Sequence, residues 1–436
     1  MRSLPASALA FALVAACRPS TVPPSGGPDA REGEGEGEGE GEGEGEGEGE
    51  GEGEGEAIFL PGVLDGARPS RASLVSLPGG GEGGPVLVSN NPEIVSGAGN
   101  LYNNARRLLT RGGAPVTLSG DFGVYLHHLV DTGTEGAGGG PPLFVSLLIS
   151  NPNAAAVTVS VRGTGLTQTE TGGLGLGTSP DFRVSEDALL GTPEEVHDDV
   201  VIDPARAFLA WQRKVNDRAE VDGRFFVHSS APVFVYVVAT NTAALNEAVT
   251  ITSGNEGDRI DAPGDYRISG DPPPPFGREA GVYAHDTWRG VVDVAVPAGP
   301  AHAGFVVNTA TGAGFSQVQA FPALAHLDGS AREAVGMYGN FYDLTVNLRH
   351  DGTSSTPRRV RVWFTSLVEA QISRYWDGKA LVDDVAVDVR HVPGAPSTLL
   401  DERTVPSGTT STMHFRAMVP GLASIPQALV IETLDP

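Results

Sequence analysis

The sequence predicts an all-β protein in which two tandem antiparallel β-sandwich domains, immunoglobulin-like or jelly-roll-like, follow a disordered tether. From residue 57 onward, the apolar runs are only about four to eight residues long and are rich in Val, Phe, Tyr and Thr. Gly, Pro, Asn and Asp separate these runs at short intervals, in a chain with 59 Gly and 33 Pro. Amphipathic helical patterns, which a parallel α/β fold needs between its strands, are almost absent.

The first residues resemble the signal peptide of a bacterial lipoprotein. Arg2 precedes an apolar stretch, residues 8–16, that is too short for a permanent membrane span of about 20 residues. The small residues before Cys17 fit a signal peptidase cleft, and the Cys17 thiol can accept a diacylglyceryl group. We therefore expect a signal peptide over residues 1–16 and a lipid on Cys17; the alternative is an ordinary signal peptide with a chance cysteine. Arg18, in place of aspartate, favours sorting to the outer membrane.

Residues 17–56 predict a flexible tether that starts at the lipid. Residues 18–31 are rich in Pro, Ser and Gly, and residues 32–56 alternate Glu with Gly, with 13 Glu in total. Such a segment has no apolar side chain to bury and repels itself, so we expect it to be disordered. A calcium-binding polyanion is the alternative, but isolated carboxylates without a fixed cage bind Ca²⁺ weakly.

The rest of the chain carries the strand pattern. In residues 157–161 and 360–364, apolar side chains alternate with others, which predicts half-buried strands. Phe234 is a candidate core side chain. Residues 204–219 have a locally helical pattern. Because an Asp-Pro step stands at their start, a strand is the alternative. Further short apolar runs occur at residues 85–89, 124–130, 143–150, 225–228, 233–239, 291–296, 344–348, 385–389 and 428–433.

A weak internal repeat in the sequence predicts the domain organisation. Residues 143–163 and 344–368 each predict a strand, a turn and a second strand, followed by a Pro-containing loop and two more strands. We therefore expect one sandwich in residues 57–270 and a second in residues 271–436, joined through the Pro-rich residues 271–276.

The composition limits the partners and the source of stability. The formal net charge is −25, and an acidic chain without a basic stripe argues against nucleic acid as a partner. Cys17 is the only cysteine, so no disulfide can form within the chain. The sandwiches must therefore be stabilised by burial alone.

Several motifs resemble those of an uncharacterised family of exported bacterial proteins, classified as a domain of unknown function. The shared elements are an SN(S/N)PE(L/I)V motif, an aromatic-x-His-His strand, a strand ending in Asn-Pro, an (N/D)GR and GPVYV pair, and a YGN element. In this chain they lie at residues 89–95, 125–128, 148–152, 222–224 with 231–235, and 336–340. They span roughly residues 60–430 and match better in the first half. The resemblance implies export and β architecture, and it assigns no catalytic residue.

Two polar motifs are candidate binding sites. The first is a predicted turn that consists of Ser89, Asn90, Asn91 and Glu93. Its side chains can line the rim of a binding site, or the turn can have a purely structural role. The second is the pair His127 and His128. Because adjacent strand residues point to opposite faces, these two cannot both bind one metal ion unless the strand is bulged. We expect a buried, hydrogen-bonded histidine here, and no metal or other cofactor.

Two acidic groups are weaker metal candidates. They are His197 with Asp198 and Asp199, and the set Asp258, Asp261 and Asp265. The first lies in an acidic run typical of a solvated loop, and the second lacks the regular spacing of a calcium loop.

The sequence contains none of the hydrolase, metalloprotease or nucleotide-binding motifs that we considered. We therefore expect a non-enzymatic structural or binding module of the cell envelope, held in the membrane by its N-terminal lipid and exposed in the periplasm or on the cell surface. The alternative is a glycan-binding or glycan-active envelope protein, with an envelope glycan or protein as its partner. Exposed aromatic side chains, or an acidic cleft with paired carboxylates, would favour that alternative. The four Trp, at positions 211, 288, 363 and 376, are expected in the cores.

Overall fold

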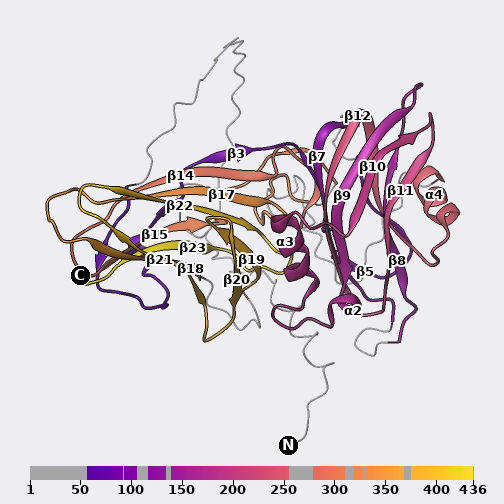
Figure 1. The fold of residues 1–436 in the computed structure, drawn as a ribbon. Helices are drawn as coiled ribbons and strands as arrows, with labels where there is room; N and C mark the ends of the chain where they lie inside the picture. Colours follow the sequence, from indigo (N-terminus) through magenta and orange to yellow (C-terminus); the bar gives the residue numbers. More distant parts are fainter. Residues whose placement is uncertain are drawn as a thin grey trace, which may run out of the picture.

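The computed structural model of the protein describes residues 56–91, 93–105, 116–133, 139–254, 278–309, 319–327, 330–367 and 375–435. The predicted signal peptide, Cys17, the predicted tether up to residue 55 and the predicted linker lie outside the described residues. Strands dominate the described part and only short helices accompany them, so the all-β prediction is confirmed (Figure 1). Within these ranges, the structure contains no helix with the length and apolar character that a membrane crossing requires.

Most of the second half of the chain forms a sandwich of two six-stranded sheets, which we call the C-terminal body (Figure 1). The first sheet has the order β1-β15-β23-β18-β21, with β2 beside β15: β1 (Leu60–Pro61), β2 (Leu74–Ser76), β15 (Ala301–Val307), β18 (Arg358–Ser366), β21 (Ser397–Val405) and β23 (Gln427–Thr433). A short 3-10 helix, η2 (Arg71–Ser73), precedes β2. The second sheet has the order β20-β19-β22-β17-β14-β3: β3 (Gly80–Glu82), β14 (Thr287–Ala295), β17 (Phe341–Arg349), β19 (Trp376–Val382), β20 (Val385–His391) and β22 (Thr410–Met418).

The two sheets of the C-terminal body bury a shared core. The ring of Phe364 in β18 lies 5.6 Å from Phe415 in β22 and 5.0 Å from Trp376 in β19, measured between centroids. Inward residues of β14 and β17, such as Val292 and Leu344, are fully buried. The alternation of apolar and other residues along these strands therefore corresponds to one buried face of each sheet.

The N-terminal body is an eleven-stranded sheet that folds over itself. Its central order is β10-β9-β12-β7-β4-β13-β16; β5 pairs with β7, β6 and β8 pair with β12, and β11 pairs with β8. The strands are β4 (Val86–Ser89), β5 (Ile94–Val95), β6 (Gly99–Asn103), β7 (Leu118–Val130), β8 (Leu143–Ser150), β9 (Val157–Thr167), β10 (Glu195–Ile202), β11 (Ala207–Val215), β12 (Glu220–Thr240), β13 (Ala280–Tyr283) and β16 (Ala323–His326). Most strand pairs in both bodies are antiparallel, and the parallel pairs are β4 with β7, β5 with β7, β2 with β15 and β14 with β17.

The long strand β12 belongs to both layers of the N-terminal body. Its first half, up to Ser229, pairs with β7 and β9, and its second half, from Phe234, pairs with β8. The register shifts between Ser229 and Val233, where Pro232 has no N–H to donate to a ladder. The strand therefore changes layer at this proline, and Phe225 of its first half meets Trp211 of β11 across the core at 5.6 Å.

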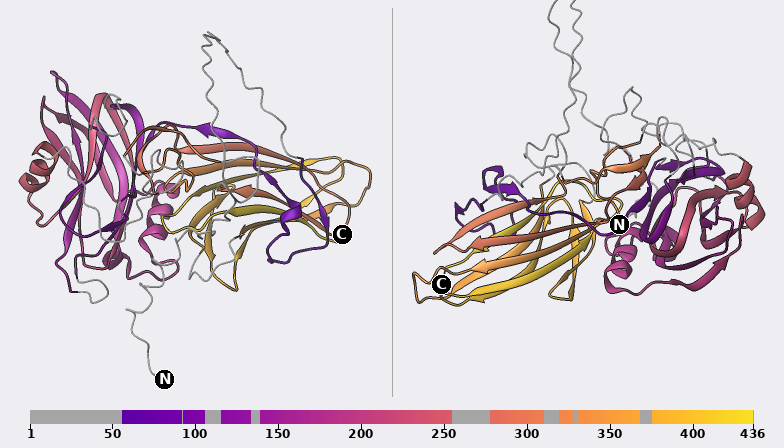
Figure 2. Two further views of the ribbon diagram at one scale, coloured as in Figure 1. Left: turned by 180° about the vertical axis from the view of Figure 1, so that it is seen from behind. Right: turned by 90° about the horizontal axis from the view of Figure 1, so that it is seen from above.

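In the described residues, three α-helices accompany the strands: α2 (Gln168–Thr171), α3 (Pro180–Leu190) and α4 (Leu245–Gly254). Helix α3 lies between the two bodies, against β9 and β12 on one side and β19 and β22 on the other (Figures 1 and 2). Ser179 caps its first turn, Pro180 is its first residue, and Gly191 ends it at φ +66°. The Ser179 hydroxyl also donates to Asp377 of β19 at 2.8 Å, so this cap connects the helix to the C-terminal body.

The two predicted domain ranges, residues 57–270 and 271–436, exchange strands. The strands β1, β2 and β3 precede residue 83, but they lie in the two sheets of the C-terminal body. Conversely, β13 and β16 follow residue 278 and extend the sheet of the N-terminal body through β4. The chain therefore enters the C-terminal body, builds the N-terminal body and returns, so a single cut at residue 270 does not separate the sheets.

The structure decides one open alternative and corrects one expectation. The strand alternative for residues 204–219 is confirmed at residues 207–215, which form β11 and pair with β8 with a register shift between Leu209 and Trp211. Phe234 is only half-buried, whereas Val233 and Val235 are fully buried. The valines of this run therefore face the core and Phe234 faces away from it.

Candidate functional site

The predicted polar turn after β4 lies inside the protein. The Ser89 Oγ is 2.9 Å from Nε2 of His128, and Asn91 Nδ2 donates to Oγ of Ser330 at 2.7 Å. Ser89 and Asn91 are fully buried, and Asn90 is 3% exposed. The turn therefore connects neighbouring segments through buried hydrogen bonds and does not present an accessible rim.

Two glutamates lie beside this turn. Glu93 forms an ion pair with Arg278. The buried Glu279 accepts a hydrogen bond from the Gly336 N–H at 2.9 Å. Burial raises the pKa of Glu279 to about 8, although backbone hydrogen bonds oppose the shift. The protein therefore holds a largely protonated carboxyl group here at neutral pH.

His127 and His128 point to opposite faces of β7, as adjacent strand residues must. His128 faces the interior of the N-terminal body, where it contacts Ser89. His127 faces α3 and the C-terminal body, beside Asp181 and Asp222. The two rings therefore belong to different environments.

His127 lies among buried carboxylates in a group that we call the junction cluster: His127, Asp181, Glu220 and Asp222. Asp222 of β12 is directly opposite His127 in the strand register, and Glu220 lies two residues earlier on the same face. Asp181 comes from the first turn of α3. The His127 Nδ1 is 3.5 Å from Asp222 Oδ1 and 3.7 Å from Asp181 Oδ1. All four side chains are at most 2% exposed.

The electrostatics of the junction cluster follow from burial and from its excess of carboxylates. Burial lowers the pKa of His127, but the three neighbouring carboxylates outweigh burial and raise this pKa to about 9. Burial raises the pKa of Asp222 to about 6, although His127 opposes the shift. Burial, together with the nearby carboxylates, also holds the pKa of the Tyr125 hydroxyl well above its usual range. The cluster thus favours a positive charge at its centre, either an imidazolium or a metal ion.

Among the described residues, His127, Asp181 and Glu220 form a group that could hold a metal ion, because one ligand atom from each lies within 4.8 Å of the others. Imidazole nitrogen and carboxylate oxygen are common ligands of Zn²⁺ and Mn²⁺. His128 is not part of this group, because it points to the opposite face of β7. The partners of His127 come instead from α3 and β12, which are remote in the sequence.

Glycines of the C-terminal body close the junction cluster. An added Cβ on Gly421 would lie 2.3 Å from His127 Nδ1 and 2.6 Å from the Tyr125 hydroxyl oxygen. Gly339, at φ +73°, packs so closely that an added Cβ would lie 2.2 Å from Cγ of Tyr125. Only glycine allows this approach, so the YGN element and the His-His strand meet at the interface between the two bodies.

The outward face of β12 continues from the junction cluster toward the surface. The buried Arg224 forms an ion pair with Asp286 at 2.9 Å, and Asp286 directly precedes β14 of the C-terminal body. The Arg224 guanidinium also lies 4.6 Å from the ring centroid of Phe226 and 5.4 Å from that of Phe341. Arg224 therefore connects the two bodies and supports the exposed Phe226 ring.

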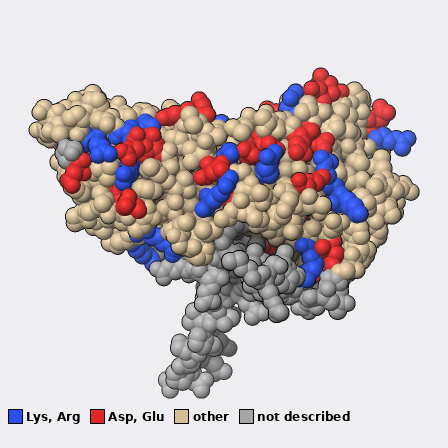
Figure 3. All heavy atoms as spheres, turned by 60° about the horizontal axis from the view of Figure 1, so that its bottom comes forward, with Lys and Arg blue, Asp and Glu red and all other residues tan. Residues whose placement is uncertain are grey.

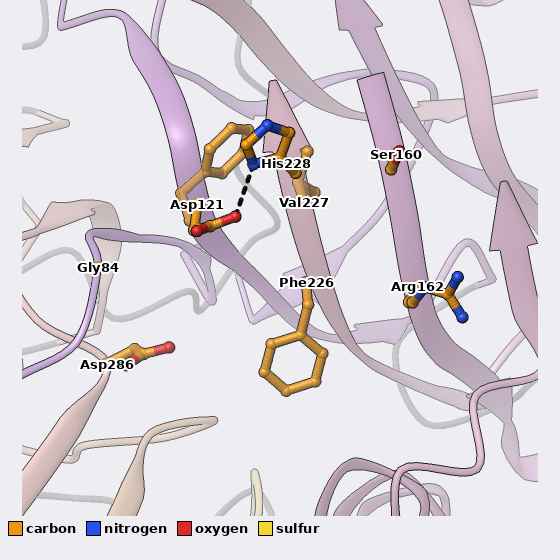
Figure 4. Close-up of a pocket in the computed structure, with 9 residues that line it drawn as sticks. Gly84, Asp121, Ser160, Arg162, Phe226, Val227, His228 and Asp286 are labelled. Atoms are coloured by element: carbon orange, nitrogen blue, oxygen red, sulfur yellow. Dashed lines mark hydrogen bonds and ion pairs between the residues drawn. The ribbon is translucent and has the colours of Figure 1, made fainter. Parts of the chain in front are cut away.

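Two adjoining pockets open around Phe226, with volumes of about 330 and 210 Å³. We call the two pockets together the Phe226 groove, and Figure 4 shows the larger of them. Both pockets contain Arg162 and Phe226. The larger is also lined by Gly84, Asp121, Phe122, Ser160, Val227, His228 and Asp286. The smaller is also lined by Gly163, Thr164, Asp187, Ala188, Gly191, Pro193 and Arg224.

The Phe226 groove combines an aromatic ring with charged side chains. The Phe226 side chain is 39% exposed, and Figure 4 shows its ring between Asp286 and Arg162. The His228 Nδ1 lies 2.7 Å from Asp121 Oδ1 at the other end of the pocket. The groove therefore offers an apolar surface flanked by both signs of charge.

Charges on one face of the molecule are mixed. Figure 3 shows this face, on which basic and acidic side chains are interspersed over the described part of both bodies.

The remaining sequence candidates do not assemble into a site in the described residues. His197 of β10 is 3.0 Å from the carbonyl oxygen of Ala210, and its ring packs on Phe208 at 5.1 Å. Asp198 pairs with Arg162. The set Asp258, Asp261 and Asp265 and the lipid-attachment candidate Cys17 lie outside the described residues. Of the Trp residues, three are buried and Trp363 is partly buried.

Residues 73–172 match a family described as a protein of unknown function (DUF3370). The matched segment includes the polar turn after β4 and both His127 and His128, in agreement with the resemblance to an uncharacterised family. Its description assigns no activity. The other members of the junction cluster and Phe226 lie beyond the matched residues. No curated protein matches the chain.

The carboxylates of the junction cluster and the exposed Phe226 are not among the residues predicted from the sequence. Asp181 follows Ser179 and Pro180, a combination that is typical of a helix start but does not by itself indicate a site. Glu220 and Asp222 are spaced by two, which indicates a shared strand face. That this face meets His127 depends on the pairing of β7 with β12, for which the sequence contains no local signal.

Proposed function

We propose that the protein is a lipid-anchored binding module of the bacterial cell envelope, facing the periplasm or the cell surface, and that the Phe226 groove is its binding face. The observation that carries this proposal is the exposed aromatic ring in a concave surface beside a small number of charged groups. Such a combination of an apolar surface with a few oriented polar groups is typical of ligand-binding sites.

The way in which the groove is built supports a binding role without catalysis. The buried Arg224 forms an ion pair with Asp286, whereas Arg162 and His228 contact Asp198 and Asp121 at exposed positions. The Arg224–Asp286 pair holds these two polar groups beside Phe226 before a ligand arrives. A preorganised surface of this kind favours affinity, because little side-chain entropy is lost on binding.

A glycan is the ligand class that this groove favours. The hydrophobic face of a sugar ring suits the Phe226 ring, and its hydroxyl groups suit the flanking carboxylates and guanidinium group. Asp121 and Asp286 line the same pocket. These features correspond to the exposed aromatic and acidic surface that we expected of a glycan-binding protein.

The groove is tested by binding of the full chain to peptidoglycan fragments and envelope polysaccharides. Phe226→Ala and Arg162→Ala should each weaken binding about tenfold or more, since each removes a central contact. Arg359→Ala is the matched control, because this arginine is similarly exposed, with 48% of its side chain accessible against 56% for Arg162, and pairs with Glu402 on another sheet. Unchanged binding in both groove variants contradicts the proposal, and release of sugar products would contradict its non-enzymatic part.

The anchor is tested separately. Cys17→Ser should move the protein from the membrane fraction to the soluble fraction, because no acyl chain can then be attached. Fractionation and detergent-free washes, followed by immunoblotting, measure the distribution. If the variant remains in the membrane fraction, the lipid anchor is wrong, whatever the groove binds.

A further inference from the structure

We propose that the junction cluster binds one divalent transition metal ion, with His127, Asp181 and Glu220 as its ligands. One ligand atom from each of these three lies within 4.8 Å of the others. Asp222 Oδ1 lies beside this group, 3.5 Å from His127 Nδ1. The site is distinct from the Phe226 groove, so its test does not depend on the proposed binding function.

The distances within the cluster suit an ion at its centre. His127 Nδ1 is buried and has no hydrogen-bond partner, and it faces Asp222 Oδ1 at 3.5 Å and Asp181 Oδ1 at 3.7 Å. Direct N–H···O hydrogen bonds are shorter, at about 2.7–3.2 Å. A tetrahedral ion with metal–ligand bonds of about 2.1 Å holds its ligand atoms about 3.4 Å apart. The ligand atoms of His127, Asp181 and Glu220, which lie within 4.8 Å of one another, would therefore have to move inward to reach this spacing.

The charge of the cluster also favours an ion. Three carboxyl groups surround one imidazole in a buried site. Because a buried negative charge without compensation is costly, these groups favour a cation among them.

The ligand set favours Zn²⁺, with Mn²⁺ as the next choice. One imidazole nitrogen and two carboxylate oxygens match the borderline preference of zinc. Calcium normally takes six to eight oxygen ligands, and this cluster supplies fewer.

The position of the cluster indicates what the ion would stabilise. His127 belongs to β7, Glu220 and Asp222 belong to β12, and Asp181 belongs to α3, which packs on both bodies. Gly421 of the C-terminal body covers the ligand atoms, because its added Cβ would lie 2.9 Å from Asp181 Oδ1. A bound ion would therefore hold α3 against the N-terminal body at the surface where the C-terminal body packs.

The test uses the full chain with Cys17→Ser, which removes the only thiol. The protein is purified without chelators and dialysed against metal-free buffer, and its metal content is measured by inductively coupled plasma mass spectrometry. We expect about one equivalent of zinc or manganese per chain. EDTA should lower the Tm, and added Zn²⁺ should restore it. A content below about 0.1 equivalent, with no change in Tm on addition of Zn²⁺ or Mn²⁺, would overturn the proposal.

Two variants and a matched control assign the ligands. His127→Gln and Asp181→Asn keep the side-chain volume nearly constant and should each lower the metal content at least about tenfold. His128→Gln is the control, because this neighbouring histidine is equally buried but faces Ser89 on the other side of β7. The Glu-Gly tract is the same in all variants, so any weak cation binding there cancels. Full metal content in both His127→Gln and Asp181→Asn would refute the ligand assignment.

Discussion

His127 and His128 differ in role because β7 places them on opposite faces. His128 belongs to the interior of the N-terminal body, and His127 belongs to its interface with α3. A shift of one residue in the pairing of β7 with β12 would either exchange the faces of these two histidines or turn the acidic side chains of β12 into the apolar core. The position of each polar residue therefore depends on strand register.

Glu279 allows a prediction at the residue scale. Its folded-state pKa of about 8 lies above the ordinary value of 4.5, so the folded protein holds a proton that the unfolded chain releases. The stabilising contribution of this proton is complete below about pH 4.5 and is lost as the pH rises through 8. Glu279→Gln, which is neutral at every pH, should remove a slope of up to about 1.4 kcal/mol per pH unit.

Urea unfolding at intervals between pH 5 and pH 8 measures this effect as the difference between wild type and variant. Glu82→Gln is the control, because the Glu82 side chain is 52% exposed on β3. It should leave the pH profile nearly unchanged. Parallel profiles for wild type and Glu279→Gln would show that Glu279 is ionised in the folded protein.

At the scale of elements, β12 and α3 organise the molecule. The inward side chains of β12, such as Phe225 and Val235, form the core of the N-terminal body. Its outward side chains form a polar row from Glu220 through Arg224 to His228. Helix α3 closes the buried end of this row with Asp181. One strand therefore provides both the apolar core and most of the polar site.

The two faces of β12 predict different costs of mutation. Phe225 is fully buried against Trp211, so Phe225→Ala should lower the free energy of unfolding by about 3–5 kcal/mol. Phe234 is half-buried, so Phe234→Ala should cost clearly less. Denaturant unfolding of both variants checks this order. Equal losses would contradict the assignment of Phe225 to the core and Phe234 to the outer face.

At the scale of the whole molecule, the exchanged strands make the two bodies dependent on each other. The strands β1, β2 and β3 complete the C-terminal body, and β13 and β16 extend the N-terminal body. The ion pair between Arg224 and Asp286 and the contact of α3 with β19 add further connections. Neither body can leave the other without the loss of strands from a sheet.

The tether prediction also belongs to the whole molecule and rests on composition. A Glu-specific protease should cut residues 32–56 rapidly and leave a stable fragment that contains both bodies, because only the tract combines many Glu with no apolar side chains. Mass spectrometry of a digestion time course identifies the cut sites. Protection of the tract, or early cuts within both bodies, would contradict the prediction.

The sequence alone determined the strand-rich class of this protein, because the period of two and the Gly-, Pro- and Asn-rich turns are local signals. It also determined that His127 and His128 cannot face the same way. The helix α3 had a local signal as well, in Ser179, Pro180 and Gly191, although its apolar pattern is weak. Only the tertiary structure decided which strands share a sheet, because pairing between distant segments follows from mutual burial and from register. For that reason the exchange of strands, the meeting of His127 with Asp181 and Asp222, and the exposure of Phe226 appear only in the folded molecule.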